Sequence, residues 1–131
     1  GDLYRCGVSW VAVTDPRLLF RSDWLSDFND EFRQYTLPQM VGDPVADAAM
    51  LAEVAPVELA AKLKTPLLLA FGGQDRRVPL EHGLRLREAM QAAGSEPEWI
   101  VYDAEGHGWI KPENRYDFAR RMETFLAKHL K

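Results

Sequence analysis

The sequence predicts an α/β fold in which parallel strands alternate with helices. Three short apolar runs are typical of strands and cover residues 4–14, 67–71 and 99–102. Two amphipathic segments are typical of helices and follow the second and third runs, at 80–93 and 112–130. The order strand, helical insert, strand, helix, strand, helix indicates a parallel sheet joined by right-handed crossovers.

The first apolar run ends at Asp15-Pro16, where the proline disfavours helix in the residue before it. Its β-branched and aromatic residues predict a buried strand. The insert after it has an irregular pattern, and we expect three helical pieces there: near 27–35, from Asp43-Pro44 through Glu53, and over 57–63. Proline is favoured at the first position of a helix, which is why Asp43-Pro44 marks the start of the second piece.

The second apolar run, at 67–71, is continuous and suits a parallel strand buried on both faces, although its periodicity alone also allows a buried helix. Gly72-Gly73 ends this run. The helix at 80–93 places a stripe of small and apolar residues on one face, namely Gly83, Leu86, Met90 and Ala93, with Gly94 just past its end. The helix at 112–130 is expected to turn four apolar side chains inward: Phe118, Met122, Phe125 and Leu126.

Three parallel strands make a small sheet with at least one exposed apolar edge. Such an edge pairs readily with a further strand. We therefore expect that a preceding strand of the sheet is missing from this chain. We also expect the isolated chain to self-associate through the exposed sheet edge.

Composition limits the classes of protein to which this chain can belong. The 131 residues suit one domain, and 47% apolar with 27% charged residues is typical of a globular chain. The net charge of −4 gives no basic surface for nucleic acid, and no apolar run approaches the roughly 20 residues of a membrane span. The single cysteine, Cys6, forbids an internal disulfide and fits a cytoplasmic location. Three histidines and one cysteine make no metal-ligand spacing.

An acidic residue and a histidine follow the ends of two successive predicted strands. Asp75 comes after Gly72-Gly73, and His107 stands between Gly106 and Gly108. The α/β-hydrolases present the last two members of a Ser-Asp-His triad in this order. Asp75 would accept a hydrogen bond from the imidazole, and His107 would act as general base. The alternatives are a turn aspartate and a histidine on a surface loop.

The chain offers no convincing nucleophile. Ser9 lies in Gly7–Val11, which matches G-x-S-x-G until valine replaces the last glycine, and it falls within a predicted strand. Cys6 lacks the flanking glycines of an elbow, and three further serines lie in polar segments: Ser22, Ser26 and Ser95. We therefore expect residues 1–131 to be a partial α/β-hydrolase catalytic domain without the nucleophile elbow, and we assign no oxyanion hole within it.

The remaining candidates favour structural roles. His82 and His129 are expected to be structural histidines, and His129 is placed to meet the negative end of its helix. Asp103 and Glu105 stand close to His107 and are expected to be solvated. Four aromatic residues between the first strand and the insert are expected to form core or cover rather than a substrate pocket: Trp10, Phe20, Trp24 and Phe28.

Two motifs within residues 65–114 carry a resemblance to a known family. The first reads G-x-x-D-x-x-V-P, with Gly72, Asp75, Val78 and Pro79, and the second reads E-G-H-G-W followed by K-P-E-N, at 105–109 and 111–114. Together they resemble the prolyl oligopeptidase family of serine peptidases, in its acylaminoacyl-peptidase and dipeptidyl-peptidase-like branch.

The resemblance implies the C-terminal portion of an α/β-hydrolase fold, a covalent acyl-enzyme mechanism, no cofactor, and an upstream β-propeller that restricts substrates to peptides. It makes Asp75 the orienting acid and His107 the general base. The expected function is a serine-type peptidase in a full-length parent, with this chain inactive alone. Two alternatives stand beside it: an esterase-type hydrolase, and a non-catalytic α/β module that self-associates and binds without turnover.

Overall fold

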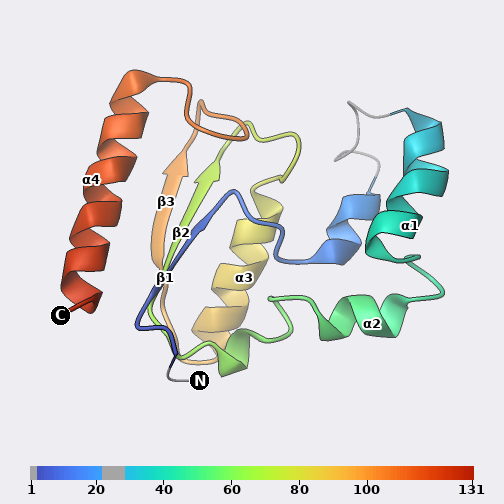
Figure 1. The fold of residues 1–131 in the computed structure, drawn as a ribbon, viewed down its shortest axis with the longest axis horizontal. Helices are drawn as coiled ribbons and strands as arrows, with labels where there is room; N and C mark the ends of the chain where they lie inside the picture. The colour runs from blue at the N-terminus through green and yellow to red at the C-terminus, as the bar shows by residue number, and fades with distance from the viewer. Residues whose placement is uncertain (1–2, 22–28) are drawn as a thin grey trace.

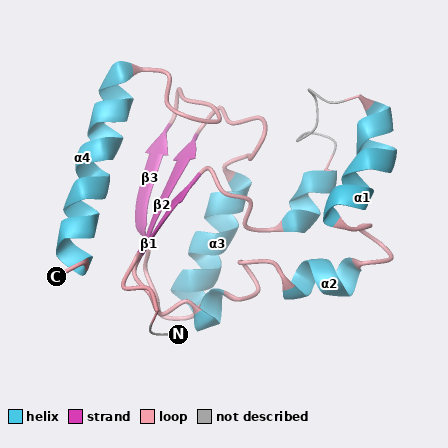
Figure 2. Cartoon of the chain, viewed as in Figure 1, coloured by secondary structure: helices cyan, strands magenta, loops and turns pink. Residues whose placement is uncertain are grey.

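A three-stranded parallel sheet forms the centre of the fold. The computed structural model describes residues 3–21 and 29–131. The strands are β1 (Gly7–Trp10), β2 (Leu67–Gly72) and β3 (Glu98–Tyr102), and they lie in the order β1-β2-β3. Helix α3 (Glu81–Ala92) covers one face of the sheet, and helix α4 (Pro112–His129) covers the other (Figures 1 and 2). The α/β prediction is confirmed.

Strand β2 contributes side chains to the hydrophobic core on both faces of the sheet, because its side chains alternate between the two faces. Leu69 and Phe71 pack with residues of α3, whereas Leu68 and Ala70 pack with residues of α4. All four side chains are fully buried. The continuous apolar run is therefore a strand, as predicted, and not a buried helix.

Strand β1 differs from the prediction. It covers four residues rather than the whole of 4–14, and it is half-buried rather than buried. Val11 ends it with a φ of 46°, a left-handed conformation that is rare for a β-branched residue. Within the described residues β1 pairs only with β2, which leaves its other edge and much of Trp10 uncovered.

The insert between β1 and β2 lies beside α3, on the side away from α4 (Figure 1). It contains a 3₁₀ helix at Pro16–Phe20, a π-helical segment at Phe32–Thr36 that continues into α1 (Leu37–Val41), then α2 (Ala48–Glu53) and a 3₁₀ helix at Ala60–Lys62.

Two helix boundaries in the insert were predicted wrongly. The first helical piece runs on to Val41 instead of ending at 35, because Leu37 is buried against Leu19; its predicted start at 27–28 lies outside the described residues. The second begins at Ala48 rather than after Asp43. The Asp43 carboxylate accepts hydrogen bonds from the backbone N–H groups of the next two non-proline residues, at 2.8 and 2.7 Å, and this fixes a turn there instead.

The two long helices match their predictions within one residue at each end. In α3 the apolar stripe faces the sheet, and Gly94 ends the helix with a φ of +77°. In α4, Phe118 and Phe125 are buried, and Met122 and Leu126 are half-buried. In the part of the chain that the structure describes, no helix is both long and apolar enough to cross a membrane.

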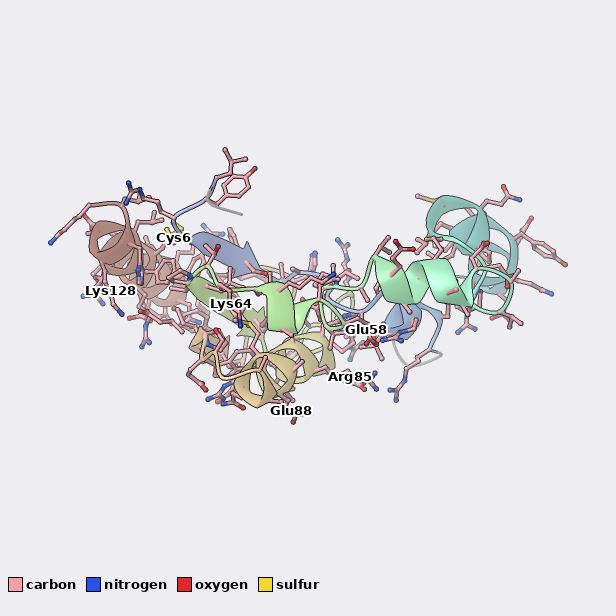
Figure 3. All side chains as sticks on the ribbon, turned by 90° about the horizontal axis from the view of Figure 1, so that it is seen from below. Cys6, Glu58, Lys64, Arg85, Glu88 and Lys128 are labelled. Carbon is pink, nitrogen blue, oxygen red and sulfur yellow. The ribbon has the colours of Figure 1, made fainter. Side chains whose placement is uncertain are left out.

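Gly83 sets the distance between α3 and β2. A Cβ atom on this residue would lie 2.5 Å from a ring carbon of Phe71 and 2.7 Å from one of Trp99. We expect Gly83→Ala to lower the free energy of unfolding, because overpacking costs about 1–3 kcal/mol and exceeds the gain in helix propensity of about 1 kcal/mol. The matched control is Glu88→Ala on the outer side of α3 (Figure 3), which should be nearly neutral. Urea denaturation compares the two variants, and equal stabilities would contradict the prediction.

Candidate active site

The two candidate catalytic residues lie in loops at one edge of the sheet. Asp75 follows β2 and His107 follows β3. Parallel strands end at the same edge, and ligands of open α/β sheets bind beyond these carboxyl ends. The topology therefore brings together two side chains that are 32 positions apart in the sequence.

Asp75 and His107 form a direct hydrogen bond. The imidazole Nδ1 lies 2.9 Å from the Asp75 Oδ2. The Asp75 side chain is 0% exposed, whereas that of His107 is 35% exposed. When Nδ1–H donates to the carboxylate, Nε2 is left with the lone pair that accepts a proton. The buried Asp75 carboxylate thus selects the tautomer of His107, and the partly exposed His107 ring presents Nε2 as a base.

The backbone fixes the orientation of the Asp75 carboxylate. Its Oδ1 accepts hydrogen bonds from the N–H groups of Arg77 at 2.8 Å and Val78 at 2.9 Å. This is the local bonding expected of a turn aspartate, and it leaves Oδ2 for the imidazole. One carboxylate oxygen of Asp75 therefore bonds the turn, and the other bonds the His107 imidazole.

Two glycines allow the loops after β2 and β3 to touch. A Cβ atom on Gly72 would lie 2.1 Å from the Gly106 carbonyl oxygen, and one on Gly73 would lie 2.7 Å from the Asp103 Cα. The contact is closed by hydrogen bonds from Gly73 N to the Tyr102 carbonyl at 3.0 Å and from Gln74 N to the Glu105 carbonyl at 2.8 Å. The loops are thus held backbone to backbone.

His107 sits at the tip of a tight turn. The N–H of Gly108 donates to the Gly106 carbonyl at 2.9 Å, so the chain reverses over three residues. Gly108 has a φ of +126°, a conformation that side chains rarely adopt. The second glycine of the G-H-G motif is therefore required by the backbone path.

Glu105 corrects one prediction of the sequence analysis. It was expected to be solvated, but it is only 2% exposed. Its carboxylate accepts hydrogen bonds from Ile110 N at 2.8 Å, Lys111 N at 3.0 Å and Asn114 Nδ2 at 2.7 Å. The bond from Ile110 and the Asn114 amide hold the pKa of this carboxyl below its usual range. Asp103, by contrast, is exposed as predicted.

The side chains considered as nucleophiles are not brought to the pair. Ser9 lies inside β1, and Cys6 packs against the apolar layer under α4. Ser95 follows the end of α3, where its N–H donates to the Met90 carbonyl. Within the described ranges, no hydrogen bond joins any of these three to His107. Ser22 and Ser26 lie outside the described residues, as do Trp24 and Phe28.

His82 is fully buried and has a structural environment, as predicted. Its Nδ1 accepts from the backbone N–H groups of Thr14 at 3.2 Å and Asp15 at 3.4 Å, which ties α3 to the segment after β1. Burial lowers the pKa of His82. His129 packs against Phe125, with ring centroids 4.7 Å apart.

Aromatic side chains pack beneath the histidine loop. Trp10 is 48% exposed and lies 5.5 Å from Trp109 and 5.1 Å from Phe118, between ring centroids. Tyr102 meets Trp109 edge-on at 4.8 Å. These contacts join side chains of β1, β3 and α4 around Trp109. Among the residues that the structure describes, no three His, Cys, Asp or Glu side chains are grouped to hold a metal ion.

Comparison with known proteins gives consistent matches. A model of the prolyl oligopeptidase family matches residues 1–131. Dipeptidyl aminopeptidase BIII of Pseudoxanthomonas mexicana is 33% identical over 134 residues, which cover 98% of this chain and 19% of that protein. A "Putative carboxymethylenebutenolidase" of Methylorubrum extorquens is 38% identical over 95 residues, which cover 67% of this chain and 33% of that protein.

The fold agrees with solved structures. The acylaminoacyl peptidase of Pyrococcus horikoshii matches with a TM-score of 0.83 at 22% identity, over 100% of this chain and 21% of that chain. The chain therefore spans about one fifth of the length of this peptidase and of the dipeptidyl aminopeptidase.

The contact at Gly72 generates a prediction. Gly72→Ala would push a methyl group against the Gly106 carbonyl, so we expect the two loops to separate and the protein to lose stability by about 1–3 kcal/mol or more. Gly106→Ala is the matched control, because its Cβ would find no atom nearer than the Gln74 carbonyl oxygen at 3.8 Å. Thermal unfolding followed by circular dichroism measures both variants, and the prediction fails if Gly72→Ala is as stable as the control.

Proposed function

The chain belongs to the prolyl oligopeptidase family, and from this premise we propose that it is the part of a serine peptidase catalytic domain that supplies the acid and the base of the triad. The observation that carries the proposal is the hydrogen bond between the buried Asp75 carboxylate and the half-exposed His107 imidazole. A buried carboxylate that fixes the tautomer of a reachable imidazole is the arrangement that general-base catalysis needs.

In this proposal His107 moves the proton in both halves of the reaction. Its Nε2 takes the proton of a serine hydroxyl as the serine oxygen attacks a peptide carbonyl, and then gives that proton to the leaving amine. The acyl-enzyme is hydrolysed by water along the same route. Asp75 stays ionised, holds Nδ1–H and stabilises the imidazolium that forms at each transfer.

The serine and the oxyanion donors would come from a segment upstream of residues 1–131. The matched peptidases are about five times as long as this chain, which supports a partial catalytic domain. The free edge of β1 is where a preceding strand would pair, since parallel sheets are normally covered on both sides. By the same reasoning this chain would be inactive alone. A cytoplasmic location belongs to the proposal and is supported by the single cysteine.

An esterase is the second candidate. Its support is the similarity to a protein named as a butenolidase rather than a peptidase. The acyl-transfer chemistry of Asp75 and His107 would be the same for an ester, so the pair does not separate the two functions. Substrate preference does: the full-length protein would cleave peptide anilides well as a peptidase, and short-chain esters preferentially as an esterase.

We expect Asp75→Asn in the full-length protein to lower kcat by about 10⁴-fold, because an asparagine presents the wrong partner to Nδ1. His107→Ala should abolish turnover. His129→Ala is the matched histidine control and should keep its activity, since this ring packs against Phe125 at the far end of α4. Peptide-anilide hydrolysis under saturating substrate is the measurement. Full activity of His107→Ala would contradict the assignment of His107, and absence of turnover in the unmodified full-length protein would favour the non-catalytic module.

The open edge of β1 leads to the prediction that the isolated chain self-associates. Gly7 and Val11 donate their N–H groups towards β2, so strand alternation turns the N–H of Val8 outward. Sedimentation velocity should show a mass that rises with concentration, and Val8→Pro should weaken the association by removing one outward donor. A chain that stays monomeric at all concentrations would refute this part of the proposal.

A further inference from the structure

We propose that Glu105 is a positioning residue for His107, a role that rests on the proposed peptidase function. Glu105 lies two residues before His107 in the loop after β3. Its side chain is buried and bonds to residues 110, 111 and 114. It therefore acts on the imidazole through the shape of the loop and not by contact.

The three donors to the Glu105 carboxylate all come from beyond His107. Oε2 accepts from Ile110 N, and Oε1 accepts from Lys111 N and from the Asn114 side chain. The carboxylate thus bridges the two ends of the segment that carries His107. The same segment is also held by the bond between Gly108 and Gly106 and by the Arg115 Nε, which donates to the Trp109 carbonyl at 2.7 Å.

The backbone of Glu105 ties the same loop to the acid. Its carbonyl oxygen accepts the N–H of Gln74 at 2.8 Å, one residue before Asp75. Glu105 therefore fixes the histidine loop in two ways. Its side chain bonds to residues 110, 111 and 114 beyond His107, and its carbonyl oxygen bonds to the loop that carries Asp75. These two attachments set the position of the imidazole relative to the carboxylate.

The charge of Glu105 matters as well as its size. A buried carboxylate offers only acceptors, and here each oxygen faces N–H groups. A glutamine of the same length has one oxygen and one NH₂ group, so whichever way it turns, at least one donor faces another donor. Glu105→Gln should therefore loosen the loop, and Glu105→Ala should loosen it further.

The experiment uses the full-length protein and separates kcat from KM. We expect Glu105→Ala to lower kcat by roughly 10²-fold, the cost of a small misplacement of a catalytic group, with KM unchanged. Glu105→Gln should fall between this variant and the unmodified protein. A second readout is the rate at which a peptide chloromethyl ketone alkylates the His107 Nε2 with loss of chloride, which should fall in the same order.

The matched control is Asp43→Ala. Asp43 is also a carboxylate that accepts two backbone N–H groups, but it lies in the insert before α2. Activity is measured well below the melting temperature of each variant, so that every protein is folded. If Glu105→Ala does not fold, Glu105→Gln and Asn114→Ala, which removes one of the three donors, carry the test.

The outcomes separate three conclusions. A loss of kcat and of alkylation rate in the Glu105 variants, absent from Asp43→Ala, supports the positioning role. Normal kcat in folded Glu105 variants overturns it, even if their melting temperatures fall, and so does an equal loss in Asp43→Ala. Full activity of His107→Ala, measured alongside, shows instead that His107 is not the general base, whereas absence of peptide hydrolysis by the unmodified protein shows that the proposed peptidase function is wrong.

Discussion

The close approach of the loops after β2 and β3 is the constraint on which the candidate site depends. Neighbouring parallel strands end at one edge, but side chains normally keep their following loops apart. Gly72 and Gly73 remove that obstacle, and the loops meet through their backbones. The 2.9 Å bond between Asp75 and His107 is a consequence of this contact. The hydrophobic layers around β2 hold the two strands, and the glycines let the loops that follow them come within hydrogen-bond distance.

Buried carboxylates organise this edge of the protein. Asp75 and Glu105 are each held by backbone N–H groups, and Asp15 accepts from Arg17 through both backbone and side chain. Burial alone would raise the pKa of the Asp15 carboxyl, but the hydrogen bonds from Arg17 outweigh it and lower the pKa. Fixed donors thus keep charge inside the protein without a mobile solvent shell. A site built on such anchors has little freedom to rearrange, which suits an acid–base pair.

The side chains that pack the sheet against its helices also hold the loop that carries His107. Trp109, two residues after His107, packs between Trp10, Tyr102 and Phe118, so the histidine loop rests on side chains from two strands and α4. Helix α3 is fixed on the other face by His82, which binds the backbone after β1. Within the described residues, the outer edge of β1 is unpaired and Trp10 is partly exposed.

The sequence by itself determined the parallel α/β order and the two long helices, because these depend on local periodicity. It also placed Asp75 and His107 just past successive strands, because glycines mark where those strands end. It also predicted that His82 is structural. Only the tertiary structure decided that Glu105 is buried, since its donors at 110, 111 and 114 become neighbours only when the loop closes. It likewise shortened β1, whose strand-forming residues have a pairing partner on one side alone. The burial of a side chain and the pairing of a strand depend on residues that are distant in the sequence, so a local sequence pattern does not predict them.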